Sequence, residues 1–346
     1  KRQRTVDGQE DSPTRLPAPL AALSQRQQQI REALAQAKAA DAVRRKQGVN
    51  PATNPAQVPT TDPESRVMPN KEGGYAPNYT PTATTDGHRG FIVDHDVSSE
   101  VNEGNILPAS VDRIEETFGE KPDKMLTDAG NNSGHIADAM EQRGVEFYAP
   151  IESSQPQDGN PAKRDDPTAP IPEAEWSKLP RNNQRQLDKT CFVYNPDKDV
   201  YYCPQGHAMR FEKTKPGECG GVRFTRRVYR CGACDDCPLA TACISSKNKH
   251  GRTISRDEFE EVRERTVVRM ASATARKLYN QRPRIAETTF GIIKSTMGLR
   301  QFLLRGLDKV KTEWCWAATA FNVAKLVREI ARMRAEFSKL ATEMER

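Results

Sequence analysis

Short apolar strands and amphipathic helices alternate between residues 79 and 150, and this alternation restricts the fold more than any other feature. The run Tyr79–Thr85 is rich in β-prone residues but carries Pro81, so it predicts an edge strand. The dipeptide Asp86-Gly87 predicts a hairpin turn into a stronger strand at 90–98. The expected elements that follow are a helix at 105–118 with Phe118 facing inward, a strand at 124–127, a helix at 133–143 and a strand at 145–150. This order predicts a mixed α/β sheet flanked by helices.

The rest of the chain divides by composition. With 24 Pro, 21 Gly and 36% hydrophobic residues in 346, part of the chain is expected to lie outside a packed core. The predicted regions are a polar N-terminal region with a helix at 21–46 and a Pro-rich linker (1–60), the first part of the α/β core (61–151), an exposed linker and cysteine-rich insertion (152–256), and a helical part of the core (257–346).

Charge and hydropathy narrow the functional classes. The net charge is +6, and cations exceed acids most clearly in the C-terminal third, which favours a polyanionic partner there. No apolar run approaches the roughly 20 residues of a membrane span and no signal peptide is visible, so no membrane partner and a cytoplasmic location are expected. The chain begins with Lys rather than Met, which suggests an N-terminally truncated fragment.

The stretch from Tyr279 to Leu307 joins an acid, cations and an apolar helical face. Phe290, Ile293 and Met297 follow Glu287 at helical spacing and predict one apolar stripe. Basic residues follow in the same stretch, among them Lys294, Arg300 and Arg305. A last amphipathic helix is expected at 313–337. Its predicted buried side comprises Trp314, Ala317, Ala320, Phe321, Ala324, Leu326 and Ile330.

Two carboxylates are candidates for a metal site. Asp128 follows the strand predicted at 124–127. This strand is expected to be central in the sheet, and open α/β sheets keep their sites at the C-terminal ends of such strands. Glu287 would supply a second carboxylate from a distant helix, and hard cations such as Mg²⁺ or Mn²⁺ take oxygen ligands from several directions. The simpler interpretations are a turn aspartate and a solvated helical glutamate.

Six of the eight cysteines fall between Cys203 and Cys243, a density that favours metal binding over disulfides in a reducing compartment. Two ligand sets for a tetrahedral Zn²⁺ stay open: Cys231, Cys234, Cys237 and Cys243, or Cys203 and His207 with Cys231 and Cys234. Reduced thiols in a small β insertion are the alternative, and iron–sulfur ligation is less favoured.

The run AETTFGIIKSTMGLRQFLLRGLDKVKTEWCWAATAFNVAKL, with DAGN upstream, resembles the DDE transposases of bacterial insertion sequences, which have a ribonuclease H-like core. One branch of this family carries a motif of Tyr, Arg, Glu and Lys, in which two, three and six residues separate the successive members. Tyr279, Arg282, Glu287 and Lys294 fill these positions, except that four residues separate Arg282 from Glu287; Arg284 could substitute.

The resemblance implies that Asp128 and Glu287 are the second and third acids of a catalytic triad. It also implies that Tyr279, Arg282 and Lys294 contact transposon-end DNA, to which the charge pattern adds Arg300 and Arg305. The first acid normally lies in an apolar-Asp-Gly-Thr strand. Only Asp7 offers that position, in polar surroundings, and Asp62 and Asp86 are weaker substitutes.

The expected function is therefore metal-dependent cleavage at transposon ends and strand transfer into target DNA, by a homodimer on double-stranded DNA in a bacterial nucleoid. The chain could be inactive as a fragment. The alternatives are a non-catalytic DNA-binding remnant of a transposase and a metal-dependent nuclease.

Overall fold

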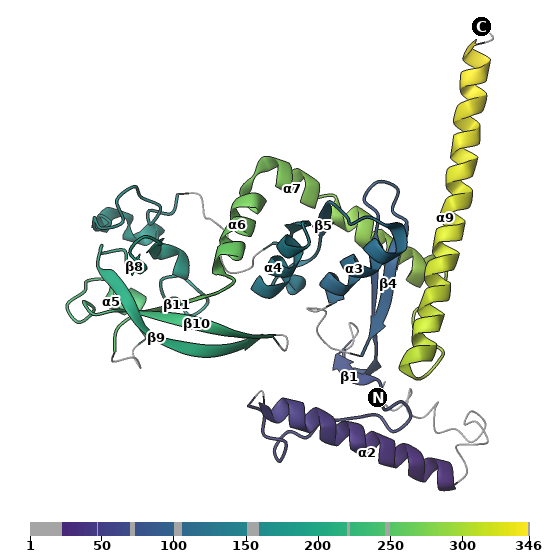
Figure 1. Ribbon diagram of the computed structural model, residues 1–346, viewed down its shortest axis with the longest axis horizontal. Coiled ribbons are helices and arrows are strands. Elements are labelled where there is room, and N and C mark those ends of the chain that lie inside the picture. The colour runs from purple at the N-terminus through teal and green to yellow at the C-terminus, as the bar shows by residue number, and fades with distance from the viewer. Residues whose placement is uncertain are drawn as a thin grey trace. The chain divides into compact units, whose positions relative to one another are not determined.

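The computed structural model describes residues 23–46, 48–69, 73–99, 106–150, 159–219, 222–245 and 250–344 (Figure 1). The chain divides into two compact units. The terminal unit comprises Lys1–Glu103 with Pro283–Arg346, and the middle unit comprises Gly104–Arg282. The candidate Asp7 and residues 151–158 of the expected linker lie outside the described residues.

The terminal unit contains strands from the first part of the chain and helices from its end. Its elements are α2 (Leu23–Lys46), β1 (Arg66–Pro69), β2 (Tyr75–Asn78), β3 (Thr80–Thr85), β4 (Ile92–Ser98), α8 (Thr288–Gly291) and α9 (Leu307–Met344). Two π-helical turns, Pro283–Glu287 and Ile292–Thr296, flank α8. The expected helix near 21–46 and the expected strands near 79–85 and 90–98 are confirmed.

Strands β3 and β4 form the expected antiparallel hairpin. The carboxylate of Asp86 closes its turn by accepting the backbone N–H groups of His88, Arg89 and Gly90 at 2.9, 2.7 and 2.9 Å. Partial burial would raise the pKa of Asp86, but these backbone donors outweigh it and hold the pKa below its usual value. Asp86 therefore has a structural role in the turn.

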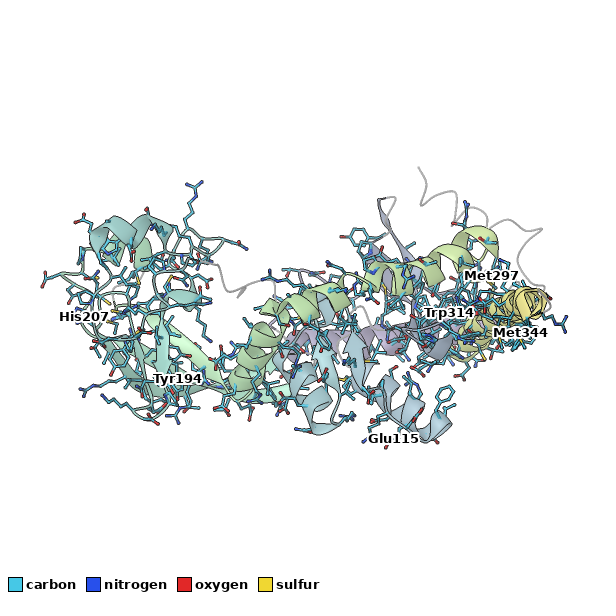
Figure 2. The ribbon with its side chains drawn as sticks, turned by 90° about the horizontal axis from the view of Figure 1, so that it is seen from above. Glu115, Tyr194, His207, Met297, Trp314 and Met344 are labelled. Carbon is cyan, nitrogen blue, oxygen red and sulfur yellow. The ribbon has the colours of Figure 1, made fainter. Side chains whose placement is uncertain are left out.

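Helix α9 packs against β4 through both polar and apolar contacts. Asn322 accepts the backbone N–H of Ile92 at 2.9 Å and donates to its carbonyl at 2.8 Å, so one amide replaces a missing strand partner. Trp314, labelled in Figure 2, donates its indole N–H to the Thr82 carbonyl at 2.8 Å and stacks on Phe290 with centroids 5.8 Å apart. The buried core here comprises Ile92, Val97, Ile293, Val310, Trp314, Ala317, Ala318 and Phe321.

The predicted buried side of the last helix is correct only in its N-terminal half. Trp314, Ala317 and Phe321 are buried, but Ala320, Ala324, Leu326 and Ile330 are exposed. The physical reason is length: α9 has 38 residues and β4 only 7, so the helix continues well beyond the strand that it covers (Figure 1). The inward orientation expected for Phe118 is also wrong, because its side chain is exposed.

The middle unit has two cores, the first of them around a parallel strand pair. Its elements are α3 (Ile106–Phe118), β5 (Lys124–Leu126), α4 (Gly134–Gln142), β6 (Glu146–Tyr148), α6 (Glu260–Ala271) and α7 (Ala273–Tyr279). Helix α4 connects the parallel strands β5 and β6, as the alternating pattern predicts. Its polar face is tied to α3 by Arg143 and Asp112 at 2.7 Å and to α6 by Glu141 and Arg265 at 2.6 Å.

The expected single mixed sheet is not formed by the described strands. They form two-stranded sheets β1-β2, β3-β4 and β5-β6, and one five-stranded sheet in the cysteine region. Among the described strands β5 has a partner, β6, on one edge only, so Asp128 does not follow a central strand as expected. A mixed α/β architecture is confirmed, while a ribonuclease H-like arrangement stays a prediction.

The second core of the middle unit belongs to the cysteine module, which we define as residues 159–257. Its sheet is antiparallel in the order β11-β10-β9-β8-β7. The bounds are β7 (Val193–Asn195), β8 (Val200–Tyr202), β9 (Ala208–Cys219), β10 (Val222–Cys231), α5 (Ala240–Cys243) and β11 (Thr253–Asp257). Residues expected to be exposed linker enter this core instead, because Ile171, Leu179 and Leu187 are buried in it. In the part of the chain that the structure describes, no helix has the length and apolarity to cross a membrane.

Candidate functional site

Asp128 lies in a short turn that begins where β5 ends. The backbone N–H of Thr127 donates to the Tyr148 carbonyl at 3.1 Å and extends the pairing of β5 with β6 by one residue. The chain then turns through a 3-10 segment at Ala129–Asn131, which places the Asp128 side chain in an exposed position. The strand end therefore presents a carboxylate to solvent.

Two asparagines hold this turn. The amide of the buried Asn131 donates to the Thr127 hydroxyl and to Asp128 Oδ1, both at 3.1 Å. The amide of Asn132 donates to the carbonyls of Ala149 and Pro150 at 3.2 and 2.9 Å, which ties the turn to the end of β6. These contacts restrict the orientation of Asp128 before any ligand binds.

Tyr279, at the end of α7, reaches the same turn. Its hydroxyl donates to the Thr127 carbonyl at 3.0 Å. The guanidinium of Arg282 lies 5.9 Å from the Tyr279 ring centroid, within range of a cation–π interaction. The structure thus places Tyr279 beside the turn that carries Asp128, and Arg282 beside the Tyr279 ring.

Glu287 ends a π-helical turn, Pro283–Glu287. A π-turn accommodates one residue more than an α-helical turn and is frequent at functional sites. The extra residue between Arg282 and Glu287 therefore has a structural counterpart at that point of the chain. Glu287 itself is exposed.

Of the three residues predicted to form an apolar stripe after Glu287, two pack inward. Ile293 is buried and Phe290 packs on Trp314, but Met297 is 38% exposed. Lys294 is exposed, with its ammonium 5.8 Å from the Phe290 ring centroid. The helical segment thus buries one face and leaves Glu287 and Lys294 accessible.

The loop after this segment carries Arg300 and Arg305, both exposed, between glycines at 298 and 306 with positive φ. We call residues 298–306 the basic loop. Acidic side chains hold its backbone: Glu313 accepts the N–H groups of Leu303 and Leu304 at 2.9 and 3.0 Å, and Asp62 accepts that of Gly306 at 3.2 Å. Sequence reasoning missed both acids in this role.

Asp62 is not an accessible acid. It is buried and also accepts the Tyr79 hydroxyl at 2.8 Å. Burial, with this contact, raises the pKa of Tyr79. Asp128 belongs to the middle unit. Glu287 belongs to the terminal unit, as do Lys294, Arg300 and Arg305, so the surroundings of the two carboxylates are described separately.

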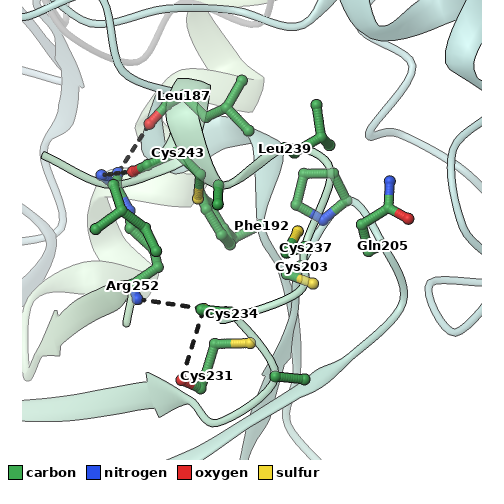
Figure 3. Close-up of a pocket in the computed structure, with 14 residues that line it drawn as sticks. Leu187, Phe192, Cys203, Gln205, Cys231, Cys234, Cys237, Leu239, Cys243 and Arg252 are labelled. Atoms are coloured by element: carbon green, nitrogen blue, oxygen red, sulfur yellow. Dashed lines mark hydrogen bonds between the residues drawn. The ribbon is translucent and has the colours of Figure 1, made fainter. Parts of the chain in front are cut away.

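The cysteine module gathers five sulfur side chains around one pocket, lined by Cys203, Cys231, Cys234, Cys237 and Cys243 (Figure 3). His207 is exposed and is not part of this lining. Within the described ranges, no group of three or more His, Cys, Asp or Glu side chains has the arrangement of a metal site. The pocket therefore contains thiols without a preformed metal geometry.

The sulfurs of the pocket differ in their contacts. The Cys231 thiol donates to the Cys203 sulfur and lowers the pKa of Cys203, and the backbone N–H groups of Gln205 and His207 add to this shift against the effect of burial. Cys234 accepts the backbone N–H of Arg252 at 3.5 Å. Burial raises the pKa of Cys243 to about 12, as expected for a buried thiol.

Comparisons with known proteins bear on the region from β8 to α9. A family model described as a transposase DDE domain matches residues 202–327. This range contains Tyr279, Glu287 and the five cysteines that line the pocket, whereas Asp128 lies outside it. Neither the curated proteins nor the solved structures gave a match.

The match supports a protein of the nucleotidyl-transferring class. More particularly, it supports a DDE transposase.

Proposed function

We propose that this chain is a transposase that cleaves DNA at the ends of a mobile element and transfers the ends to target DNA. The observation that carries the proposal is the hydrogen bond from Tyr279 to Thr127. It links the turn that presents Asp128 to a residue inside the matched transposase range. A bacterial insertion-sequence origin is part of the same proposal.

Asp128 and Glu287 would each serve as a ligand of Mg²⁺ or Mn²⁺. The donor chemistry fits: both are exposed carboxylates, and hard cations bind oxygen. A bound divalent ion supplies stabilisation of charge at the phosphodiester. The chain's own contributions are to orient Asp128 through Asn131 and to bind phosphates through Lys294, Arg300 and Arg305.

The test is cleavage of a plasmid that carries the genomic segments flanking the reading frame, with Mg²⁺ or Mn²⁺ present. Glu287→Gln should abolish nicking and leave DNA affinity within about twofold, because a neutral amide of similar size replaces the metal-binding carboxylate. Glu116→Gln, an exposed acid of α3, is the matched control and should cleave like the parent chain.

The same assay separates the alternatives. Cleavage followed by joining to a second plasmid supports the transposase. Cleavage without joining identifies a nuclease, and DNA binding without any cleavage identifies a non-catalytic remnant.

We also propose a structural zinc ion in the cysteine module, held by Cys203, Cys231, Cys234 and Cys237. Cys203 and Cys231 are already in contact. Backbone N–H groups point at the sulfurs of Cys203 and Cys234, and such donors favour the thiolate form that binds a metal. Metal binding would require side-chain rotation, because Cys234 now donates to the Cys231 carbonyl at 3.7 Å.

Metal content of the purified full chain tests this. One zinc per chain is expected, lost in Cys237→Ser and kept in the matched control Cys243→Ser. A parent chain without metal contradicts the zinc proposal and favours reduced thiols, while zinc loss only in Cys243→Ser contradicts the ligand set.

A further inference from the structure

The C-terminal half of α9 carries a second apolar stripe that the core of the terminal unit does not use. Its side chains are 41% to 88% exposed. The stripe consists of Val323, Leu326, Ile330, Met333, Phe337, Leu340 and Met344. Met344, labelled in Figure 2 on the helix seen nearly end-on, is the last residue of α9.

The spacing of these residues alternates strictly between three and four. This is the a and d pattern of a heptad repeat, which places all seven side chains on one narrow face of a helix. Trp316, 75% exposed, lies one heptad before Val323 and continues the face. From Trp316 to Met344 the seam is about 42 Å long at 1.5 Å per residue.

The seam is distinct from the buried face of the same helix. The core side chains of α9, such as Trp314, Ala318 and Phe321, contact the β3-β4 hairpin and the helical segment before α9. Apolar side chains that repeat at heptad spacing along exposed turns have no role in that packing. A helix with an a and d seam alone is the surface that a coiled coil buries.

The charges beside the seam indicate the partner. In this register Glu329 and Glu336 occupy g positions, and Arg334 occupies the e position five residues after Glu329. In a parallel pair of identical helices, g of one chain faces the following e of the other, so Glu329 would face Arg334. An antiparallel pair would place g against g, which sets glutamate against glutamate.

We infer that the C-terminal half of α9 forms a parallel two-stranded coiled coil with α9 of a second copy of this chain. The seam spans about four heptads, the length at which such a pattern becomes a reliable coiled-coil signal. Dimerisation through α9 is independent of the proposed catalysis. It would, however, supply the pair of subunits that two DNA ends require.

The test is sedimentation of the full chain without DNA. The parent chain should be a dimer. Ile330→Asp with Phe337→Asp should weaken dimerisation by at least about a hundredfold, because charge replaces two seam side chains in each helix. Ala331→Asp with Ser338→Asp adds the same charge one residue away, off the seam, and should stay dimeric.

Orientation has its own test. Glu329→Arg should weaken the dimer severalfold, and adding Arg334→Glu should restore it, because the swap recreates the parallel pair. A monomeric parent chain, equal effects of the seam and control variants, or no restoration by the charge swap would each overturn the inference. DNA cleavage is not part of any readout, so failure here is separate from failure of the proposed function.

Discussion

The hydroxyl of Tyr279 donates to the backbone carbonyl of Thr127 at 3.0 Å, across 152 residues of sequence. The next residue, Asp128, is the exposed acid of the strand end. A side chain at the end of α7 thus helps to fix the backbone that presents a candidate metal ligand. This contact predicts that Tyr279 positions the turn that carries Asp128.

Tyr279→Phe should therefore lower the free energy of unfolding by about 1 kcal/mol, the usual net value of one hydrogen bond. It should also reduce cleavage more than DNA affinity. Urea unfolding and a DNA titration would measure the two effects, with Tyr75→Phe, an exposed tyrosine of β2, as the control. A loss of affinity with unchanged stability would instead identify Tyr279 as a DNA contact.

Asn131→Ala should destabilise the turn before Asp128. The buried amide makes two side-chain hydrogen bonds, and its loss leaves the Thr127 hydroxyl and Asp128 without this donor, so about 1–3 kcal/mol of stability should be lost. The metal concentration for half-maximal cleavage should rise. Asn280→Ala, an exposed position at the end of α7, is the control, and equal losses in both variants would exclude a specific role of Asn131.

Arg300→Ala and Arg305→Ala should each weaken binding to any duplex and each reduce the salt dependence of log K by about one unit. Both side chains are exposed on the basic loop. Affinity measured over a range of salt concentrations would show this. Lys178→Ala, an exposed cation of the cysteine module, controls for net charge, and an unchanged slope would remove the two arginines from the DNA interface.

For Glu313→Ala, the change of net charge and the loss of a structural contact predict opposite changes in DNA affinity. Removal of an acid makes the chain more positive, so net charge alone predicts tighter DNA binding. Glu313, however, holds the backbone of Leu303 and Leu304, and its loss should release the basic loop and weaken binding. Glu173→Ala supplies the change of charge at an exposed position without that contact, and tighter binding by both variants would contradict the positional role.

Lowering the pH should destabilise the middle unit, because Glu260 loses its charge. Burial would raise the pKa of Glu260, but Lys189 and Arg263 outweigh burial and lower it. Because the folded pKa lies below the unfolded value, this contribution is present at neutral pH and is lost as pH falls through the folded pKa, below about 4.5. Lys189 contacts Glu260 at 2.5 Å, so this pair connects the cysteine module to α6.

Glu260→Gln should lower stability at pH 7 by about 2 kcal/mol, since it leaves the partly buried Lys189 and Arg263 with a neutral, weaker partner. It should also flatten the dependence of stability on pH below about 4.5. Urea unfolding at pH 7 and at a series of pH values below 4.5 measures this, with Glu173→Gln as the control. An unchanged pH dependence would assign the acid sensitivity to other groups.

Much of the local structure could be predicted because hydrophobic spacing and turn residues are local properties. The hairpin at Asp86, the strand before Asp128 and the helix after it follow the predicted ranges within a few residues. The π-turn that ends at Glu287 coincides with the one departure from the motif spacing, and only the tertiary structure reveals this turn.

Other features depended on contacts between distant residues. Asp62 looked like a spare acid in the sequence, yet Tyr79 and Gly306 bury it as a structural acceptor. Leu326 and Ile330 looked like core residues, yet α9 extends beyond β4 and leaves them exposed. Periodicity identifies an apolar face but not the surface that covers it.

The sequence by itself thus determined the alternation of strands and helices, the candidate acids, the density of cysteines and the heptad spacing of the last helix, because each is a local pattern of residue types. Only the tertiary structure decided which carboxylates are exposed, which sulfurs share a pocket and which face of α9 remains uncovered. These outcomes depend on burial and on hydrogen bonds between residues far apart in the chain, such as Tyr279 and Thr127.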